Sequence, residues 1–548
     1  MSRMSPMDRR NWVWLPGRLR FRVLGLIDVV ALWVVVAALL GAGTWWGLDT
    51  YWKHRDYCTG DLELRRMGPR DECIGVTASA YGFAAGLTDV LGRIEKENRA
   101  ALDSGRRVVS VAVVMPYTQE TDGAAMSERL IRHSLQGAHV AQHRYNQDSD
   151  TAIQLLFANV GENLDHWRAV TEELASRVTG EAPVVAAIGF PNSNDKTLAS
   201  VREGLGPDGI PAVSAVLSSR DMEDPYLFKV SPSTNQLVDA LKHYVRANSV
   251  NDEDTFMIAD DQKADNYVKN LRRVFFEEFG EDYGITDDAV ESRIATYRGK
   301  QGSERGEKRQ FRQAVTRMCA ARAKTVFLAG RDVDLPPFLS AIAQDPSCNQ
   351  GTEDEPLRIL RVSTGRDPDT ETGPMRDIAE RKHIEIVTAA AVDAPRWRAG
   401  SPGDKQVPQY FGTFARSYEQ FFDGERDNAL NDGYAVMYHD ALAAVGRAVT
   451  EAETNGVTAM DHSDVYDELR RLNTSERCAG GCVPGASGVF AFANEDIRLD
   501  KGEKEEAVVG RWPVCKPVPI VTFPDDPRDA TPLYRTYREQ GRNACPDL

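Results

Sequence analysis

Residues 108–115 read VVSVAVVM, and such a nearly continuous apolar run is typical of a strand buried on both faces of a parallel sheet. Similar short runs recur along the chain, with amphipathic segments between them. These are AIQLLFANV (152–160), PVVAAIG (183–189), IPAVSAV (210–216), DTFMIA (254–259), SRIATY (292–297), KTVFLAG (324–330), LRILRVS (357–363) and HIEIVTAA (383–390). Strands and helices that alternate in this way predict an α/β fold of doubly wound parallel sheets. The region is too long for one core, because single cores stop growing near about 250–300 residues, so we expect two lobes.

The N-terminal region predicts a membrane anchor. Residues 29–48 (VVALWVVVAALLGAGTWWGL) carry no charge and, as a helix rising about 1.5 Å per residue, would reach about 30 Å, the thickness of the hydrocarbon core. Six arginines precede this stretch, whereas only Lys53 and Arg55 follow it closely. The positive-inside rule therefore places residues 1–28 in the cytoplasm and the body of the chain outside the cell. The alternative is a cleaved signal peptide, but its apolar region is normally only about 7–15 residues long.

All eight cysteines follow the predicted anchor, which indicates disulfide bonds in an exported body. The simplest pairing joins neighbours in sequence, and it is one of 105 connectivities. It gives Cys58–Cys73, Cys319–Cys348, Cys478–Cys482 and Cys515–Cys545. Residues 49–106, which include the first of these loops and a predicted helix at 88–103, are interpreted as an extracellular stalk or cap.

The sequence predicts neither an enzyme nor a nucleic-acid-binding protein. Eighty-two acidic against 66 basic side chains give a formal net charge of -16, which opposes binding to a phosphate backbone. The glycine-rich GLGPDG (204–209) follows a helix instead of a strand, so it does not fit a dinucleotide site. HVAQH (139–143) lacks the glutamate of a hydrolytic zinc motif. We therefore expect no catalytic residues, no cofactor and no metal site.

Several longer stretches carry a family resemblance. They are VAVVMPYT (111–118), AAIGFPNSNDK (186–196), IPAVSAVLSSRD (210–221), YLFKVSPST (226–234), FMIADDQKADNYVKNL (256–271), TVFLAGRDVDLPPFL (325–339), GYAVMYHDALAAVGRA (433–448) and GASGVFAFANEDI (485–497). On these stretches the chain resembles the type I periplasmic binding proteins, the leucine/isoleucine/valine-binding group of ABC-transporter solute-binding components. The resemblance implies a two-lobed domain over 107–522, followed by a tail at 523–548. The first lobe would take about 107–232 and 392–482, and the second about 233–391 and 483–522.

The resemblance also implies a ligand site between the lobes. In the first lobe it points to Asn192, Ser193, Leu217, Ser218 and Ser219, and in the second to Lys263, Asp265, Arg331, Asp332, Ser363 and Thr364. Two alternatives stay open. Serines at these positions often cap helices, and the charged cleft residues can pair with each other when the lobes close.

These residues suggest a polar or charged ligand. Amino-acid binders of the family present aromatic rings from the second lobe, whereas this chain offers Ala264-Asp265 and Arg331-Asp332 there. Ser363–Thr364 also lacks an acidic group to pair an α-ammonium. Together, the predicted anchor at 29–48 and the resemblance imply a membrane-anchored extracellular protein that binds a small polar solute, amino-acid-like or other, for an ABC-type permease. The alternatives are a sensing ectodomain that acts through a membrane partner, and a degenerate binding fold with an interaction role.

Overall fold

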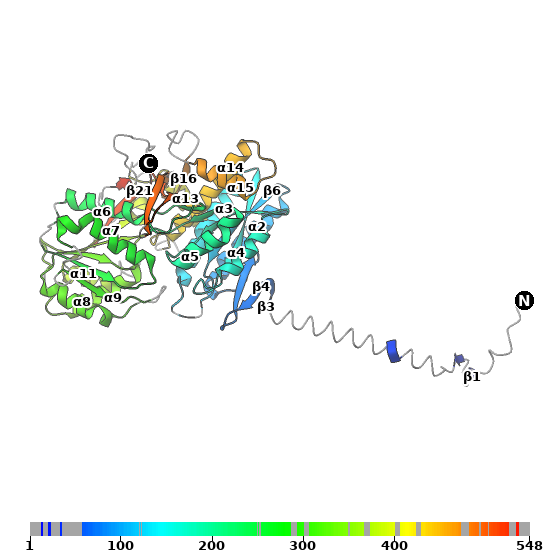
Figure 1. Cartoon of the computed structure of the whole chain (residues 1–548), viewed down its shortest axis with the longest axis horizontal. Coiled ribbons are helices and arrows are strands. Elements are labelled where there is room, and N and C mark those ends of the chain that lie inside the picture. Colours follow the sequence, from blue (N-terminus) through cyan, green and yellow to red (C-terminus); the bar gives the residue numbers. More distant parts are fainter. Residues whose placement is uncertain are drawn as a thin grey trace, which may run out of the picture. The chain divides into compact units, whose positions relative to one another are not determined.

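Two separate sheets organise residues 67–548, and each contains five parallel strands (Figure 1). The computed structural model describes residues 12–14, 20–22, 33–35, 57–119, 121, 123–248, 250, 254–285, 293–300, 306–348, 351–366, 373–400, 406–422, 429–472, 482–492, 495–501, 504–524 and 533–535. Residues 1–66 form a unit of their own. Within it, β1 (Trp12–Trp14) pairs with β2 (Arg20–Arg22), and β3 (Tyr57–Cys58) pairs with β4 (Asp61–Met67), both antiparallel.

The predicted membrane helix at 29–48 lies outside the described residues, apart from positions 33–35. Among the helices that the structure describes, none combines the length and the apolar character needed to span a bilayer.

The first lobe is built on a sheet with strand order β10-β9-β8-β6-β7-β5. Its strands are β5 (Glu72–Thr77), β6 (Arg107–Met115), β7 (Thr151–Asn159), β8 (Val184–Gly189), β9 (Ala212–Ser214) and β10 (Leu227–Lys229). Five are parallel, and β5 runs antiparallel to β7. The apolar runs thus predicted the parallel strands correctly, whereas the antiparallel strand β5 was missed.

Helices cover both faces of this sheet, as the apolar character of β6 predicts. Val111 and Val113 point into one core, with α2 (Thr88–Asp103), α3 (Glu128–Asp148) and α14 (Tyr434–Thr454). Ala112 and Val114 point into the other, with α4 (Trp167–Ser176) and the helical turn at Ser200–Leu205. The further helices of this lobe are α5 (Asp195–Ala199), α12 (Ala394–Ala399), α13 (Phe411–Phe421) and α15 (His462–Arg471).

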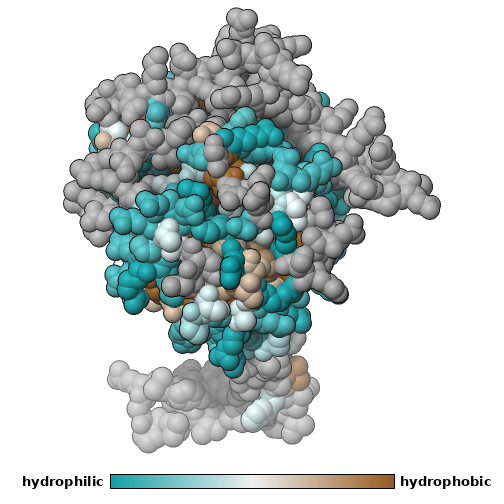
Figure 2. All heavy atoms as spheres, turned by 90° about the vertical axis from the view of Figure 1, so that its left-hand side faces the viewer, coloured by the Kyte–Doolittle hydropathy of each residue, from teal (hydrophilic) through white to brown (hydrophobic). Residues whose placement is uncertain are grey.

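The second lobe repeats this architecture with strand order β12-β11-β13-β14-β15-β21-β22. Its strands are β11 (Thr255–Asp260), β12 (Ile294–Tyr297), β13 (Thr325–Ala329), β14 (Leu357–Ser363), β15 (Ile384–Ala390), β21 (Pro517–Phe523) and β22 (Leu533–Arg535). The first five are parallel, and β21 and β22 extend the sheet in antiparallel fashion. Its helices are α6 (Thr234–Ala247), α7 (Asn266–Tyr283), α8 (Lys308–Ala320), α9 (Leu335–Gln344) and α11 (Pro374–Arg381). Among the coloured residues in Figure 2, hydrophilic ones predominate, as expected when the apolar runs are buried.

Two segments lie in a different part of the fold from the one expected. Residues 72–103, interpreted as a stalk or cap, contribute β5 and α2 to the first lobe, where Leu91 and Ile94 enter the core. Residues 483–492, assigned to the second lobe, form β16 (Val483–Gly485) and β17 (Gly488–Phe492), and Phe490 is part of the first lobe's core. Two further hairpin strands, β18 (Glu495–Lys501) and β19 (Lys504–Gly510), lead to β20 (Pro513–Val514).

The disulfide bond between Cys319 and Cys348 is confirmed, and it ties the end of α8 to the loop after α9. Cys58, Cys73, Cys482 and Cys515 are also disulfide-bonded. Cys478 and Cys545 lie outside the described residues. Every pairing except Cys319–Cys348 therefore stays a prediction.

A buried ion pair lies at the hinge, by which we mean the segments around Val230 and Lys516 that pass between the lobes. Lys516, which precedes β21, donates to the Val230 carbonyl at 2.8 Å and pairs with Asp440 of α14 at 3.2 Å. Both charged side chains are fully buried. Burial alone raises the pKa of Asp440, but Lys516, His439 and Ser487 together lower it to about 2. This stabilisation is therefore fully present above the unfolded pKa near 3.8 and is lost as the pH falls through about 2.

We expect Lys516→Met to lower the free energy of unfolding by about 3–5 kcal/mol, because it leaves Asp440 buried without its counter-charge. Chemical denaturation near neutral pH measures the loss. The control is Lys242→Met, which removes a partly exposed pair with Glu278 and should cost at most about 1 kcal/mol. Equal losses in the two variants would contradict a structural role for the hinge pair.

Candidate functional site

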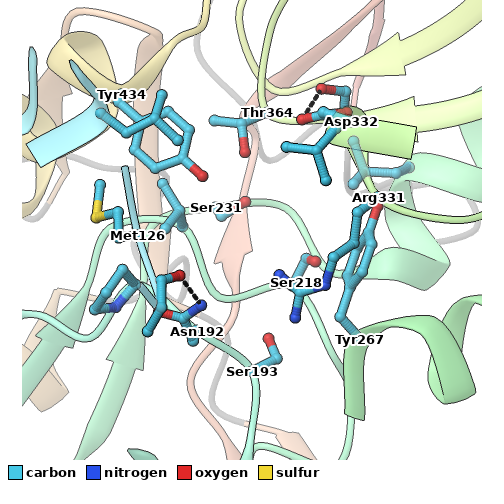
Figure 3. Close-up of a pocket in the computed structure, with 17 residues that line it drawn as sticks. Met126, Asn192, Ser193, Ser218, Ser231, Tyr267, Arg331, Asp332, Thr364 and Tyr434 are labelled. Atoms are coloured by element: carbon cyan, nitrogen blue, oxygen red, sulfur yellow. Dashed lines mark hydrogen bonds between the residues drawn. The ribbon is translucent and has the colours of Figure 1, made fainter. Parts of the chain in front are cut away.

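The carboxyl ends of parallel strands from both lobes surround a cavity of about 140 Å³ (Figure 3). In the first lobe the wall follows β8 and β9, and in the second it follows β13 and β14, the position that open parallel sheets use for ligands. The described lining residues are Ala125, Met126, Leu130, Pro191, Asn192, Ser193, Val216, Ser218, Ser231, Leu237, Tyr267, Arg331, Asp332, Val333, Ser363, Thr364 and Tyr434.

Most of the site residues expected from the sequence lie in this wall. They are Asn192, Ser193, Ser218, Arg331, Asp332, Ser363 and Thr364. The others lie elsewhere. Leu217 is buried in the core of the first lobe, and Lys263 is exposed on the surface. Ser219 and Asp265 are close to the cavity but make protein contacts instead.

Ser219 and Ser193 are not helix caps. Asn194 caps α5 by accepting a hydrogen bond from the Thr197 amide at 2.9 Å. Ser219 instead donates across the lobes to the backbone carbonyl of Asn266 at 3.1 Å. Ser193 therefore stays available to the cavity, whereas Ser219 contributes to contact between the lobes.

The first-lobe wall presents an unsatisfied acceptor. Asn192 donates through Nδ2 to the Ala125 carbonyl at 2.8 Å, and its buried Oδ1 has no partner among the described residues. The preceding loop is possible because Gly189 has φ +114, and a Cβ there would lie 2.5 Å from the Val114 carbonyl oxygen. A buried oxygen without a donor is costly, so this position favours a ligand that carries an O–H or N–H group.

The second-lobe wall is organised by two ion pairs. Asp332 pairs with Arg361 and accepts a hydrogen bond from the Ser363 hydroxyl at 3.0 Å. Arg331 pairs with Asp265, whose other oxygen caps α7 by accepting from the Tyr267 amide at 3.0 Å. The charged residues of the cleft thus pair with each other, which was one of the alternatives that the sequence left open.

Arg331 keeps part of its hydrogen-bonding capacity. It contacts Asp265 through Nε and Nη2, and its Nη1 has no partner among the described protein groups. Burial lowers the pKa of Arg331, but Asp265 outweighs this effect and the pKa is raised, so the group stays charged. In Figure 3 the side chain runs beside the Tyr267 ring toward Ser218.

Two tyrosines of the wall were missed in the sequence. Tyr267 comes from α7 in the second lobe, and its hydroxyl donates to the Val362 carbonyl at 3.3 Å. Tyr434 is the first residue of α14 and lies toward Thr364 across the cavity (Figure 3). Burial raises the pKa of each to about 12, so both rings are neutral. The expectation that the second lobe offers no aromatic ring was therefore wrong, because the first turn of α7 also faces the cavity. The sequence did contain a signal for this position, because Tyr267 follows Asp265 by two residues at the start of a helix and so lies in its first turn.

Comparison with solved structures identifies the fold. No family model matches the chain, and neither does any curated protein. A solute-binding protein of an ABC transporter from Rhodopseudomonas palustris, in complex with 3,4-dihydroxy benzoic acid, is 14% identical with a TM-score of 0.52, covering 76% of this chain and 93% of that chain. The branched-chain amino acid transporter substrate binding protein LivJ from Streptococcus pneumoniae, in complex with isoleucine, is 13% identical with a TM-score of 0.50, covering 78% of this chain and 99% of that chain. Identities this low establish the fold alone. The chain has the α/β fold of the type I periplasmic binding proteins, with two mixed sheets that are mainly parallel.

Proposed function

We propose that this chain is an extracytoplasmic solute-binding protein whose two lobes close on a small organic anion. One observation carries the proposal: the cavity between the lobes contains the charged guanidinium of Arg331 and the amide oxygen of Asn192, and neither Arg331 Nη1 nor Asn192 Oδ1 has a partner among the described residues. Its serine hydroxyls can donate to a carboxylate. The uncharged stretch at 29–48 supports anchoring at the membrane, and the fold supports delivery to an ABC-type permease.

The electrostatics of the wall favour an anion over a zwitterionic amino acid. Among the described lining residues, Asp332 is the acidic one. Its carboxylate already pairs with Arg361 and accepts a hydrogen bond from Ser363. An α-ammonium would therefore be desolvated without a carboxylate partner, which is costly. A carboxylate, in contrast, meets Arg331 and the hydroxyls of Ser193 and Ser218.

The cavity size limits the ligand to roughly one ring. A cavity of about 150 Å³ in another protein accommodates benzene, and the volume here is about 140 Å³. The rings of Tyr267 and Tyr434 supply apolar contact, and the oxygen of Asn192 calls for a donor on the ligand. A hydroxylated aromatic acid has all of these properties.

We expect the full-length chain to bind 3,4-dihydroxybenzoate at least tenfold more tightly than isoleucine, as measured by isothermal titration calorimetry. The reason is that the ammonium group of isoleucine would have no carboxylate partner in the cavity. A tenfold difference in the dissociation constant corresponds to about 1.4 kcal/mol of binding free energy. Glycerol serves as the uncharged control and should not bind. Tighter binding of isoleucine would overturn the anion proposal, and no binding across a broader panel of acids, amino acids and sugars would favour a degenerate binding fold.

Arg331→Lys should weaken binding of 3,4-dihydroxybenzoate about tenfold or more. Lysine keeps the charge beside Asp265, but it lacks the planar fork that can serve Asp265 and a ligand carboxylate together. The matched control is Arg358→Lys, which alters a pair with Glu385 at 2.7 Å in the same lobe, away from the cavity wall. Equal dissociation constants for the wild type and Arg331→Lys would show that Arg331 does not contact the ligand.

Closure of the lobes is supported by hydrogen bonds beside the cavity. Asn266 donates to Asp195 at 3.0 Å, and Asn270 accepts from the Arg220 amide at 3.2 Å. Both asparagines belong to α7 in the second lobe, and their partners belong to the first. Together with the Ser219 contact, these bonds hold the cavity shut on one side.

Removing both contacts by Asn266→Ala and Asn270→Ala should weaken ligand binding about fivefold or more, because each hydrogen bond contributes about 0.5–1.5 kcal/mol to the closed state. Calorimetry measures the affinity, and small-angle scattering should show a larger radius of gyration without ligand. Asn248→Ala is the control, since the side chain of Asn248 bonds within its own lobe, to the Tyr244 carbonyl at 2.9 Å. An unchanged affinity and radius would mean that these bonds do not govern closure.

A further inference from the structure

Two buried carboxyl groups, those of Asp260 and Asp334, lie near Arg331 but are not among the residues that line the cavity. Asp260 ends β11, next to Tyr297 at the end of β12, and Asp334 ends the short helical turn that follows β13. Their exposed fractions are only 3% and 1%. Because all three strands end at the same edge of the sheet, these groups share one site close to the cleft.

In each carboxyl group, a single oxygen accepts every hydrogen bond that comes from the described residues. Asp260 accepts through Oδ1 from the amides of Gly299 at 2.8 Å and Gln262 at 3.0 Å. Asp334 accepts through Oδ2 from the Tyr297 hydroxyl at 2.8 Å and from the Arg331 amide at 3.3 Å. The second oxygens, Asp260 Oδ2 and Asp334 Oδ1, are buried without a partner among the described residues.

Negative charge exceeds positive charge among the described groups at this site. Arg331 is the cation that faces the pair, and it also pairs with Asp265. Asp260, Asp265 and Asp334 therefore outnumber it. Two buried carboxylates with bare oxygens and no cation between them are not expected to stay fully ionised.

We propose that Asp260 and Asp334 form a proton-binding site that sets the charge behind Arg331. The step is simple protonation, in which one carboxylate takes up one proton from solvent and becomes neutral. The consequence rests on the proposed function: a proton and an anionic ligand bind cooperatively. Neutralising the pair removes negative charge from beside the bound anion.

The electrostatic surroundings agree with this site. Burial, together with Asp260, raises the pKa of Asp334 to about 6, although Tyr297 and Arg331 oppose the shift. Burial and the nearby Asp265 raise the pKa of Asp260, although the Gly299 and Gln262 amides and Arg331 oppose it. Ionisation of Asp334 is thus unfavourable for folding, and the folded chain binds this proton more tightly than the unfolded chain does. Relative to a neutral variant, stability is fully retained below the unfolded pKa near 3.8 and is lost as the pH rises from there through about 6.

Two measurements on the full-length chain test the proposal. Calorimetry with 3,4-dihydroxybenzoate, which stays anionic over this range, should give about threefold to tenfold tighter binding at pH 5.5 than at pH 7.5, with proton uptake seen in buffers of different ionisation heat. Without ligand, Asp334→Asn should unfold at a higher temperature than the wild type at pH 7.5, and this difference should shrink as the pH falls below about 6 and vanish only near pH 3.8, the ordinary pKa of an aspartate.

Matched variants separate the site from general charge effects. Asp334→Asn should abolish the pH dependence of binding, whereas Asp354→Asn, which removes an exposed carboxylate of the same lobe, should retain it. If Asp334→Asn does not fold, Tyr297→Phe removes a donor that lowers the pKa of Asp334, so it should move both pH dependences to higher pH.

The outcomes are distinct. Altered stability profiles without any binding of 3,4-dihydroxybenzoate would support the proton site and overturn the proposed anion. Binding that does not depend on pH, with parallel stability profiles, would overturn the proton site alone. A calcium-dependent rise in the unfolding temperature of the wild type, absent in Asp334→Asn, would replace the proton by a metal ion and also overturn it.

Discussion

Burial of both faces of each sheet is the constraint on which the rest of the structure depends. Along β6, Val113 points into one core of the first lobe and Val114 into the other, and along β13, Phe327 and Leu328 do the same in the second. Polar side chains therefore reach a ligand only where the strands end. Two sheets whose carboxyl ends line one cavity thus fix where binding takes place before any particular residue is chosen.

This constraint explains how much could be predicted from the sequence. Apolar runs located the central strands, and the family resemblance pointed to Asn192, Ser218 and Arg331, which follow these strands and lie in the cavity wall. The runs do not determine which side of a loop faces the cavity. Leu217 and Ser218 are neighbours, yet one packs in the core and the other lines the cavity, because successive residues of an extended loop point to opposite sides.

Features that depend on distant partners could not be predicted. The antiparallel strand β5 lacks the continuous apolar run of the parallel strands, and residues 483–492 pack on the first lobe through Phe490. Tyr434 lies far in sequence from the other lining residues and joins them only because α14 begins beside the cleft. The same limit applies to charge: the sequence allowed Arg331 to bind a ligand or to pair with Asp265, and the structure has the ion pair while Nη1 remains free.

The hinge and the cleft differ in how many hydrogen-bond partners their buried polar groups have. At the hinge, Lys516 and Asp440 each have several partners, so a fixed charge pair there gives rigidity without any need for a ligand. Beside the cleft, Asn192 Oδ1, Asp260 Oδ2 and Asp334 Oδ1 have none among the described residues. Because an unmet buried acceptor is costly, a chain retains such groups where something outside the protein completes them. Beside the cleft a ligand or a proton can relieve this cost, and the energy released on binding becomes available to hold the lobes together.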